Sequence, residues 1–223
     1  MKKAVLVFFA LVCLGELAAG WMGWTEVHRV CKPLIMITLG VYYVMSAKHR
    51  SPVVLLALFF SLAGDVLLMF EANQGLFFIF GLLAFLASHV FYIFAYRQHQ
   101  WVAAHDALQG IQKIRASFPI VLAGTGLIIV LYPVLGPLRF PVMVYALVLI
   151  VMVLNALFRY GRTEAMSFRM VFFGALLFML SDSLLAINKF LTPVPNGGSW
   201  IMLTYMVAQY WIVLGLVRHE EKN

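Results

Sequence analysis

Residues 52–70 read PVVLLALFFSLAGDVLLMF, and this stretch decides the fold class. Only Ser61 and Asp65 carry polar side chains in it. A helix needs about 20 mostly apolar residues to cross the hydrocarbon core of a bilayer. Backbone groups in lipid must satisfy their own hydrogen bonds, and the stretch lacks the alternation of a barrel strand. The stretch therefore predicts a membrane-spanning helix.

The rest of the chain follows the same pattern. Its 223 residues are 64% hydrophobic and 11% charged, whereas a soluble domain has roughly 25% charged residues. No soluble core of this length could bury so much apolar surface, which excludes a water-soluble fold. We therefore expect an all-α integral membrane bundle that forms a single domain over residues 1–223. Its eight predicted helices cover about 4–20, 33–47, 52–70, 76–96, 118–135, 140–157, 170–190 and 200–217.

Basic residues predict how the bundle is oriented. If the N-terminus lies inside, 12 of the 16 Lys and Arg residues fall on inner segments and 4 on outer ones. This bias predicts that both termini are cytoplasmic, with a bacterial inner membrane as the expected location. It also accounts for the net charge of +7 without nucleic-acid binding. As an alternative, residues 1–20 resemble a signal peptide, whose removal would leave seven helices.

Four ionisable residues fall inside the predicted spans, where each costs about 2.5–3.5 kcal/mol on insertion scales. Such residues are the best pointers to function in a membrane protein. Glu16 is expected near the outer end of its helix, and His89 near the middle of the membrane with Tyr92 one turn away. The other two residues are Asp65 and Asp182.

The two aspartates have similar surroundings. Each aspartate follows a small residue, and one variable residue separates it from a Leu-Leu pair. Each lies 12 or 13 residues into its predicted helix, and the two helices run in the same direction. We expect the carboxyl groups at similar depth in the outer half of the membrane, in a shared polar cavity. The likeness is also a weak sign of a parallel internal repeat. The alternative is that each aspartate joins helices together by bonding a Ser, Tyr or backbone group, and Ser61, Ser181 and Ser183 lie nearby.

Lys32 precedes Pro33 at the predicted start of the second helix. A cation there opposes the helix dipole unless an anion also binds, so we expect Lys32 to hold a phosphate. The alternatives are a surface cation or an ion pair with Glu16 or Glu26. The sequence holds no His-x-x-x-His or His-Glu-x-x-His pattern, so neither a metal nor another cofactor is expected.

At these residues the chain resembles the YhhN-type lysoplasmalogenase family. The resemblance rests on Lys32-Pro33-Leu34, Phe60-Ser61-Leu62-Ala63-Gly64-Asp65, the stretch from Phe85 to Tyr92, and Ser181-Asp182-Ser183. It implies hydrolysis of the vinyl ether bond of lysoplasmalogens to a fatty aldehyde and glycerophosphocholine or glycerophosphoethanolamine. It also implies a lysophospholipid substrate in contact with membrane lipids, and it leaves the oligomeric state open.

The predicted site residues suit this reaction. Protonation of the vinyl ether needs a carboxyl group that keeps its proton, and the cation that forms needs a carboxylate. Burial and a like-charged neighbour separate the pKa values of two carboxyl groups in this way. We expect Asp65, Asp182 and His89 to be catalytic, and the remaining residues to bind substrate: Lys32, Tyr92, Ser61, Ser183 and Glu16. The alternative function is a proton-coupled transporter of a lipid or small molecule, because buried Asp and His residues also form proton relays.

Overall fold

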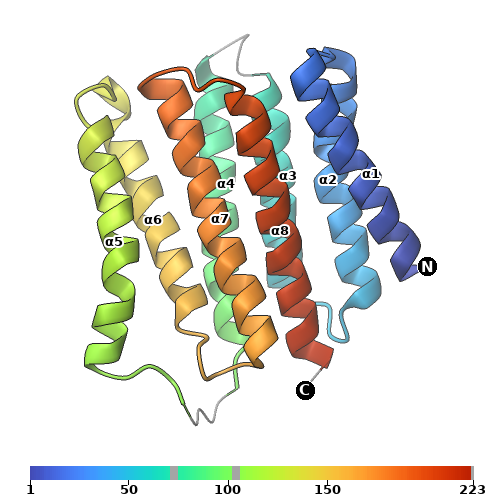
Figure 1. Cartoon of the computed structure of the whole chain (residues 1–223), viewed down its shortest axis with the longest axis vertical. Coiled ribbons are helices and arrows are strands. Elements are labelled where there is room, and N and C mark those ends of the chain that lie inside the picture. The colour runs from blue at the N-terminus through green and yellow to red at the C-terminus, as the bar shows by residue number, and fades with distance from the viewer. Residues whose placement is uncertain (71–74, 102–105, 222–223) are drawn as a thin grey trace. The chain divides into compact units, whose positions relative to one another are not determined.

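The structure is a computed structural model that describes residues 1–70, 75–101 and 106–221 (Figure 1). Within these residues the chain is entirely helical, as predicted. It forms eight α-helices and one short 3₁₀ helix: α1 (Lys2–Met22), α2 (Thr25–Ser46), α3 (Pro52–Met69), α4 (Gly75–Gln98), α5 (Ile111–Leu131), η1 (Gly136–Leu138), α6 (Arg139–Leu157), α7 (Ala165–Phe190) and α8 (Gly197–Glu221).

Seven of the eight helices in the described part of the chain are long and apolar enough to cross a membrane. The exception is α2, whose first turns carry four of the chain's polar side chains: Glu26, His28, Arg29 and Lys32. The eight expected helices are confirmed, and the protein is a multi-pass integral membrane protein.

The largest difference from the expected boundaries concerns α2, which begins eight residues before Pro33. The chain reverses at once after α1, because Gly23 adopts a left-handed conformation with φ of 70° and closes that helix through a hydrogen bond to the Ala19 carbonyl. Pro33 therefore lies inside α2, where it lacks the N–H that would bond to the Arg29 carbonyl. The prediction that Pro33 starts this helix is wrong.

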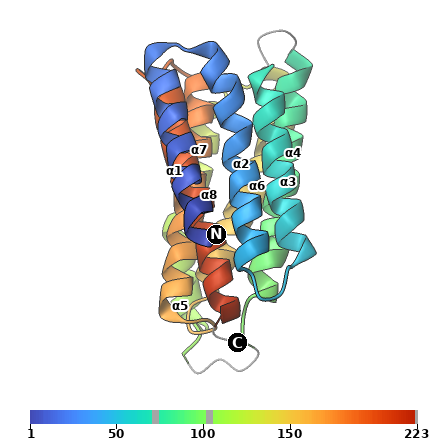
Figure 2. The same ribbon diagram turned by 90° about the vertical axis from the view of Figure 1, so that its right-hand side faces the viewer.

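The chain consists of two compact units, Met1–Ala95 and Tyr96–Asn223. In the first unit α1 packs on α2 and α2 on α3, and α3 and α4 lie side by side (Figure 2). Gly64 permits the close approach of the last pair, because a Cβ atom there would lie 2.6 Å from the Phe85 ring.

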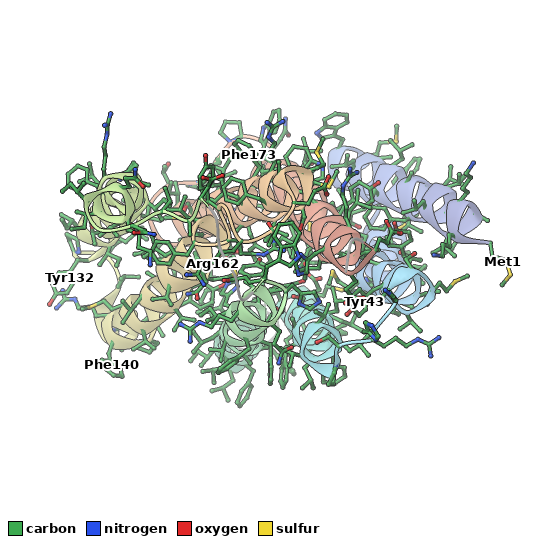
Figure 3. The ribbon with its side chains drawn as sticks, turned by 90° about the horizontal axis from the view of Figure 1, so that it is seen from below. Met1, Tyr43, Tyr132, Phe140, Arg162 and Phe173 are labelled. Carbon is green, nitrogen blue, oxygen red and sulfur yellow. The ribbon has the colours of Figure 1, made fainter. Side chains whose placement is uncertain are left out.

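In the second unit α5, α6, α7 and α8 follow one another side by side (Figure 1). The closest pair is α7 and α8, where a Cβ atom on Gly174 would lie 2.9 Å from the Ala208 carbonyl oxygen. Phe140 and Phe173 project away from these helices (Figure 3) and are 75% and 49% exposed. Such exposed apolar side chains are typical of a surface that faces lipid rather than water.

One end of the second unit is held by buried polar groups. The Arg159 guanidinium is fully buried and donates to the His99 carbonyl at 3.1 Å and to the Ser167 hydroxyl at 3.0 Å. His99 Nε2 in turn lies 2.9 Å from Glu220 Oε1. These contacts join the residues after α4, the α6–α7 connection and the end of α8. They hold these three segments together near the start of α7.

Candidate functional site

Four of the predicted site residues lie along the boundary between α3 and α4. Asp65 is 2% exposed, and Ser61, His89 and Tyr92 are fully buried. Ser61 is one helical turn before Asp65 on the same face of α3, and His89 and Tyr92 are one turn apart on α4. The structure therefore brings these four residues into one pair of packed helices.

A hydrogen-bond chain fixes how the two helices meet. The Ser88 hydroxyl donates to the Ala57 carbonyl at 2.9 Å and lies 2.7 Å from the Ser61 hydroxyl. Because Ser88 has given its only proton to Ala57, Ser61 is the donor in the second bond. The proton of Ser61 is thus used in packing α3 against α4.

This hydrogen-bond chain also sets the level of each polar group along the helix axes. Ser61 and Ser88 lie at one level. Asp65 is four residues further along α3, and Tyr92 is four residues further along α4, which runs in the opposite direction. At 1.5 Å per residue, Asp65 and Tyr92 lie about 12 Å apart along the helix axes. The polar groups of the first unit are therefore spread along the two helices and do not converge on one point.

The second aspartate has a specific partner on a neighbouring helix. The Tyr145 hydroxyl of α6 donates to Asp182 Oδ2 of α7 at 2.6 Å. A hydrogen bond to an ionised carboxyl group is among the strongest available to a side chain. Sequence reasoning missed Tyr145. The available signal was its hydroxyl group in the middle of a run that is otherwise apolar from residue 140 to residue 154.

The serines beside Asp182 are bonded to backbone carbonyls. Ser181 donates to the Ile201 carbonyl of α8 at 2.9 Å, and Ser183 donates to the Met179 carbonyl of its own helix at 2.6 Å. Their hydroxyl protons are therefore not directed at Asp182. Each oxygen retains lone-pair capacity for a further donor.

Glu16 and Lys32 lie on the α1–α2 hairpin. Glu16 is 2% exposed and lies six residues before the end of α1. Its Oε1 atom lies 2.7 Å from His28 Nδ1, which offsets part of the cost of burying the carboxyl group, and its Oε2 atom is buried without a hydrogen-bond partner among the described residues. Lys32 lies one turn after His28, is partly buried, and forms no ion pair with any residue that the structure describes. Since α2 begins at Thr25, Lys32 is not at a helix N-terminus, and that argument for a phosphate site is wrong.

The positions of the two aspartates within their helices can be compared directly. Asp65 is the fourteenth of 18 residues in α3, and Asp182 is the eighteenth of 26 in α7. The expected equal distance from the helix starts is therefore wrong, because α7 begins five residues earlier than predicted. Each aspartate nevertheless lies 4.5 residues, or about 7 Å, beyond the midpoint of its helix. The two belong to different units, and their convergence in one cavity stays a prediction.

No group of three or more His, Cys, Asp or Glu side chains among the described residues is arranged to hold a metal ion.

Comparison with known proteins places the chain in a family. Lysoplasmalogenase TMEM86A of Homo sapiens is 30% identical over 98% of this chain and 88% of its own length. Lysoplasmalogenase TMEM86B of Homo sapiens is 31% identical over 88% of this chain and 77% of its own length. No solved structure matches the chain. The YhhN family matches residues 27–216. This match covers seven of the eight helices, and the protein therefore belongs to the YhhN family.

Proposed function

We propose that this protein hydrolyses the vinyl ether bond of lysoplasmalogens. The products are a fatty aldehyde and glycerophosphocholine or glycerophosphoethanolamine. The names and long coverage of the two human relatives support this activity. The observation that carries it in the structure is a carboxyl group at the same distance beyond the midpoint of two apolar helices, α3 and α7. Such costly residues in lipid indicate a functional site.

The reaction needs only proton transfers and one water molecule. A carboxyl group donates a proton to the vinyl carbon that is farther from the oxygen. The positive charge that forms is shared by the other vinyl carbon and the ether oxygen. Water adds to that carbon and loses a proton, and the resulting hemiacetal breaks its carbon–oxygen bond to release aldehyde and alcohol. General acid–base groups and a nearby anion are sufficient for these steps.

The surroundings of the aspartates suggest a division of these roles. Asp65 is 2% exposed, and a neutral carboxyl group costs less to bury than a carboxylate. Asp182 is less buried and accepts a hydrogen bond from Tyr145, which suits an ionised carboxylate. We assign Asp65 as the proton donor and Asp182 as the carboxylate that stabilises the cation and activates water.

The other predicted residues take supporting roles in this proposal. His89 and Tyr92 lie on α4, which packs against the helix of Asp65, and would carry protons or hold water. Ser61 and Ser183 keep their helices in place through the bonds described above. The partly buried ammonium of Lys32 would attract the substrate phosphate, and Glu16 would keep the α1–α2 hairpin in position through His28.

The test of the assignment uses purified protein in detergent with a 1-alkenyl lysophospholipid. Asp65→Asn and Asp182→Asn should each abolish aldehyde release, because the amide can neither donate a carboxyl proton nor stabilise a cation by charge. Glu26→Gln is the matched control, since Glu26 is exposed and, among the residues that the structure describes, pairs only with Arg29 on its own helix. Release in detergent would also contradict a transporter, which needs two compartments. Full activity in either Asn variant would remove that aspartate from the mechanism.

The site of protonation is tested by running the reaction in deuterium oxide. The aldehyde should carry one deuterium on the carbon next to its carbonyl group. Unlabelled aldehyde incubated with the protein in deuterium oxide controls for later exchange. Aldehyde without deuterium would contradict carbon protonation. Loss of activity with a chelator and its recovery with zinc would contradict a mechanism based on carboxyl groups alone.

A further inference from the structure

The second unit contains a cavity of about 290 Å³ that the proposed reaction does not use. It lies where α6 has ended and α7 begins, and its lining includes Asp106, Tyr160, Ala165, Phe168 and Arg169. Arg169 precedes Asp182 by 13 residues on α7, which is about 20 Å along the helix. The cavity is therefore separate from the candidate catalytic carboxylate and lies at the end of the helices, where lipid headgroups are found.

The backbone holds this cavity in a defined shape. Gly161 has a φ of 68°, and a Cβ atom there would clash with the backbone oxygen of Asp106. Only glycine permits both the left-handed conformation and this approach. The segment that carries Asp106 is thereby fixed against the turn between α6 and α7.

Two opposite charges line the cavity without neutralising each other. Neither the Asp106 carboxylate nor the Arg169 guanidinium forms an ion pair or a side-chain hydrogen bond with any residue in the described part of the chain. The cavity lining therefore includes one anionic and one cationic residue, both exposed to solvent, and this combination is complementary to a ligand with the reverse pair of charges.

Aromatic rings add a second feature of recognition. The rings of Tyr160 and Phe168 contact edge to face, with centroids 5.3 Å apart, and both residues line the cavity. Aromatic faces attract ammonium groups, including quaternary ones. α7 starts at Ala165, which also lines the cavity. No side chain caps this helix, so its first amide groups are available to an anion.

We propose that this cavity binds a zwitterionic phospholipid headgroup, a phosphate joined through two carbons to an ammonium. Arg169 and the first turn of α7 bind the phosphate, and Asp106 with the Tyr160 ring binds the ammonium. The headgroup comes either from a bilayer phospholipid or from a soluble glycerophosphodiester. The site does not depend on the proposed hydrolysis. The Asp182→Asn variant should therefore bind the headgroup at this cavity as the original protein does.

Binding is tested with purified full-length protein by ligand-observed NMR. The probes are glycerophosphoethanolamine, glycerol 3-phosphate and ethanolamine, and the whole zwitterion should bind more tightly than either fragment. Arg169→Gln should weaken the binding of glycerophosphoethanolamine and of glycerol 3-phosphate about tenfold, the effect of losing one charged hydrogen bond. Asp106→Asn should weaken the binding of glycerophosphoethanolamine by about the same factor and leave the binding of glycerol 3-phosphate unchanged.

Arg115→Gln is the matched control, because Arg115 is an exposed residue on α5 that does not line the cavity. A second arm uses nanodiscs that contain phosphatidylethanolamine or phosphatidylglycerol, with retained lipid measured by native mass spectrometry. Binding in the first arm identifies a soluble ligand, and retention of phosphatidylethanolamine that Asp106→Asn abolishes identifies a bilayer lipid. Equal weakening by Arg169→Gln and Arg115→Gln, or no effect of Asp106→Asn in either arm, would overturn the proposal.

Discussion

At the scale of single residues, the hydrogen bond from Tyr145 to Asp182 is the most informative contact in the candidate site. It joins α6 to α7 at 2.6 Å and orients one oxygen of the carboxyl group. The residue that orients this carboxyl group thus comes from a neighbouring helix, and the sequence around Asp182 does not reveal it.

Tyr145→Phe should lower kcat for aldehyde release about ten- to a hundredfold and leave the folded protein intact. The reason is the loss of one hydrogen bond to a charged group, worth about 1.5–3 kcal/mol. The measurement is steady-state hydrolysis of a 1-alkenyl lysophospholipid. Tyr132→Phe serves as the control, because Tyr132 is 46% exposed and remote in sequence from the aspartates. Equal rates for Tyr145→Phe and the original protein would show that Asp182 is oriented by other contacts.

At the scale of helices, small residues decide how closely elements approach. Gly174 lies on α7 against the backbone of α8, and Gly64 lies on α3 against Phe85 of α4. In lipid, where the hydrophobic effect does not drive helices together, such close packing supplies much of the attraction. The helices of the candidate site are therefore held together partly by glycines that take no part in the reaction.

Gly174→Ala should reduce the free energy of unfolding by about 1–3 kcal/mol, the usual cost of overpacking. Its Cβ atom would lie 2.9 Å from a carbonyl oxygen of α8, and a helix backbone cannot move aside easily. Unfolding in detergent by a denaturing surfactant provides the measurement. The control is Gly126→Ala on α5, where a Cβ atom would meet nothing within 4 Å. That change should be neutral or slightly stabilising, because alanine favours helix. The same loss in both variants would contradict the packing argument.

At the scale of the whole molecule, the uneven distribution of Lys and Arg predicts orientation. Membrane insertion retains basic segments on the cytoplasmic side. We propose on this ground that both termini lie in the cytoplasm.

A fluorescent protein fused after residue 223 should fluoresce in bacteria, and alkaline phosphatase at the same place should be inactive. Alkaline phosphatase inserted between α5 and α6, after Tyr132, should be active because that connection is predicted to lie outside. The reversed pattern of reporter activity would show that the orientation is opposite. Activity of both reporters at one position would show that the inserted topology is mixed.

Much of this protein follows from local sequence. The number and type of helices, the membrane setting and the identity of the acidic residues are all predictable, because uninterrupted apolar runs have few solutions in lipid. Helix boundaries are less predictable near a proline. Pro33 is typical of a first turn, yet the reversal at Gly23 lets α2 begin eight residues earlier.

The amino-acid sequence by itself determined that eight helices form and that Asp65 and Asp182 fall within apolar helices. Only the tertiary structure decided which polar groups are partners: Tyr145 with Asp182, Ser61 with Ser88, and Glu16 with His28. The physical reason is that these helices are apolar on nearly every side. Without a polar face, local sequence cannot indicate which side of a helix meets its neighbour, and packing alone sets the direction of each side chain.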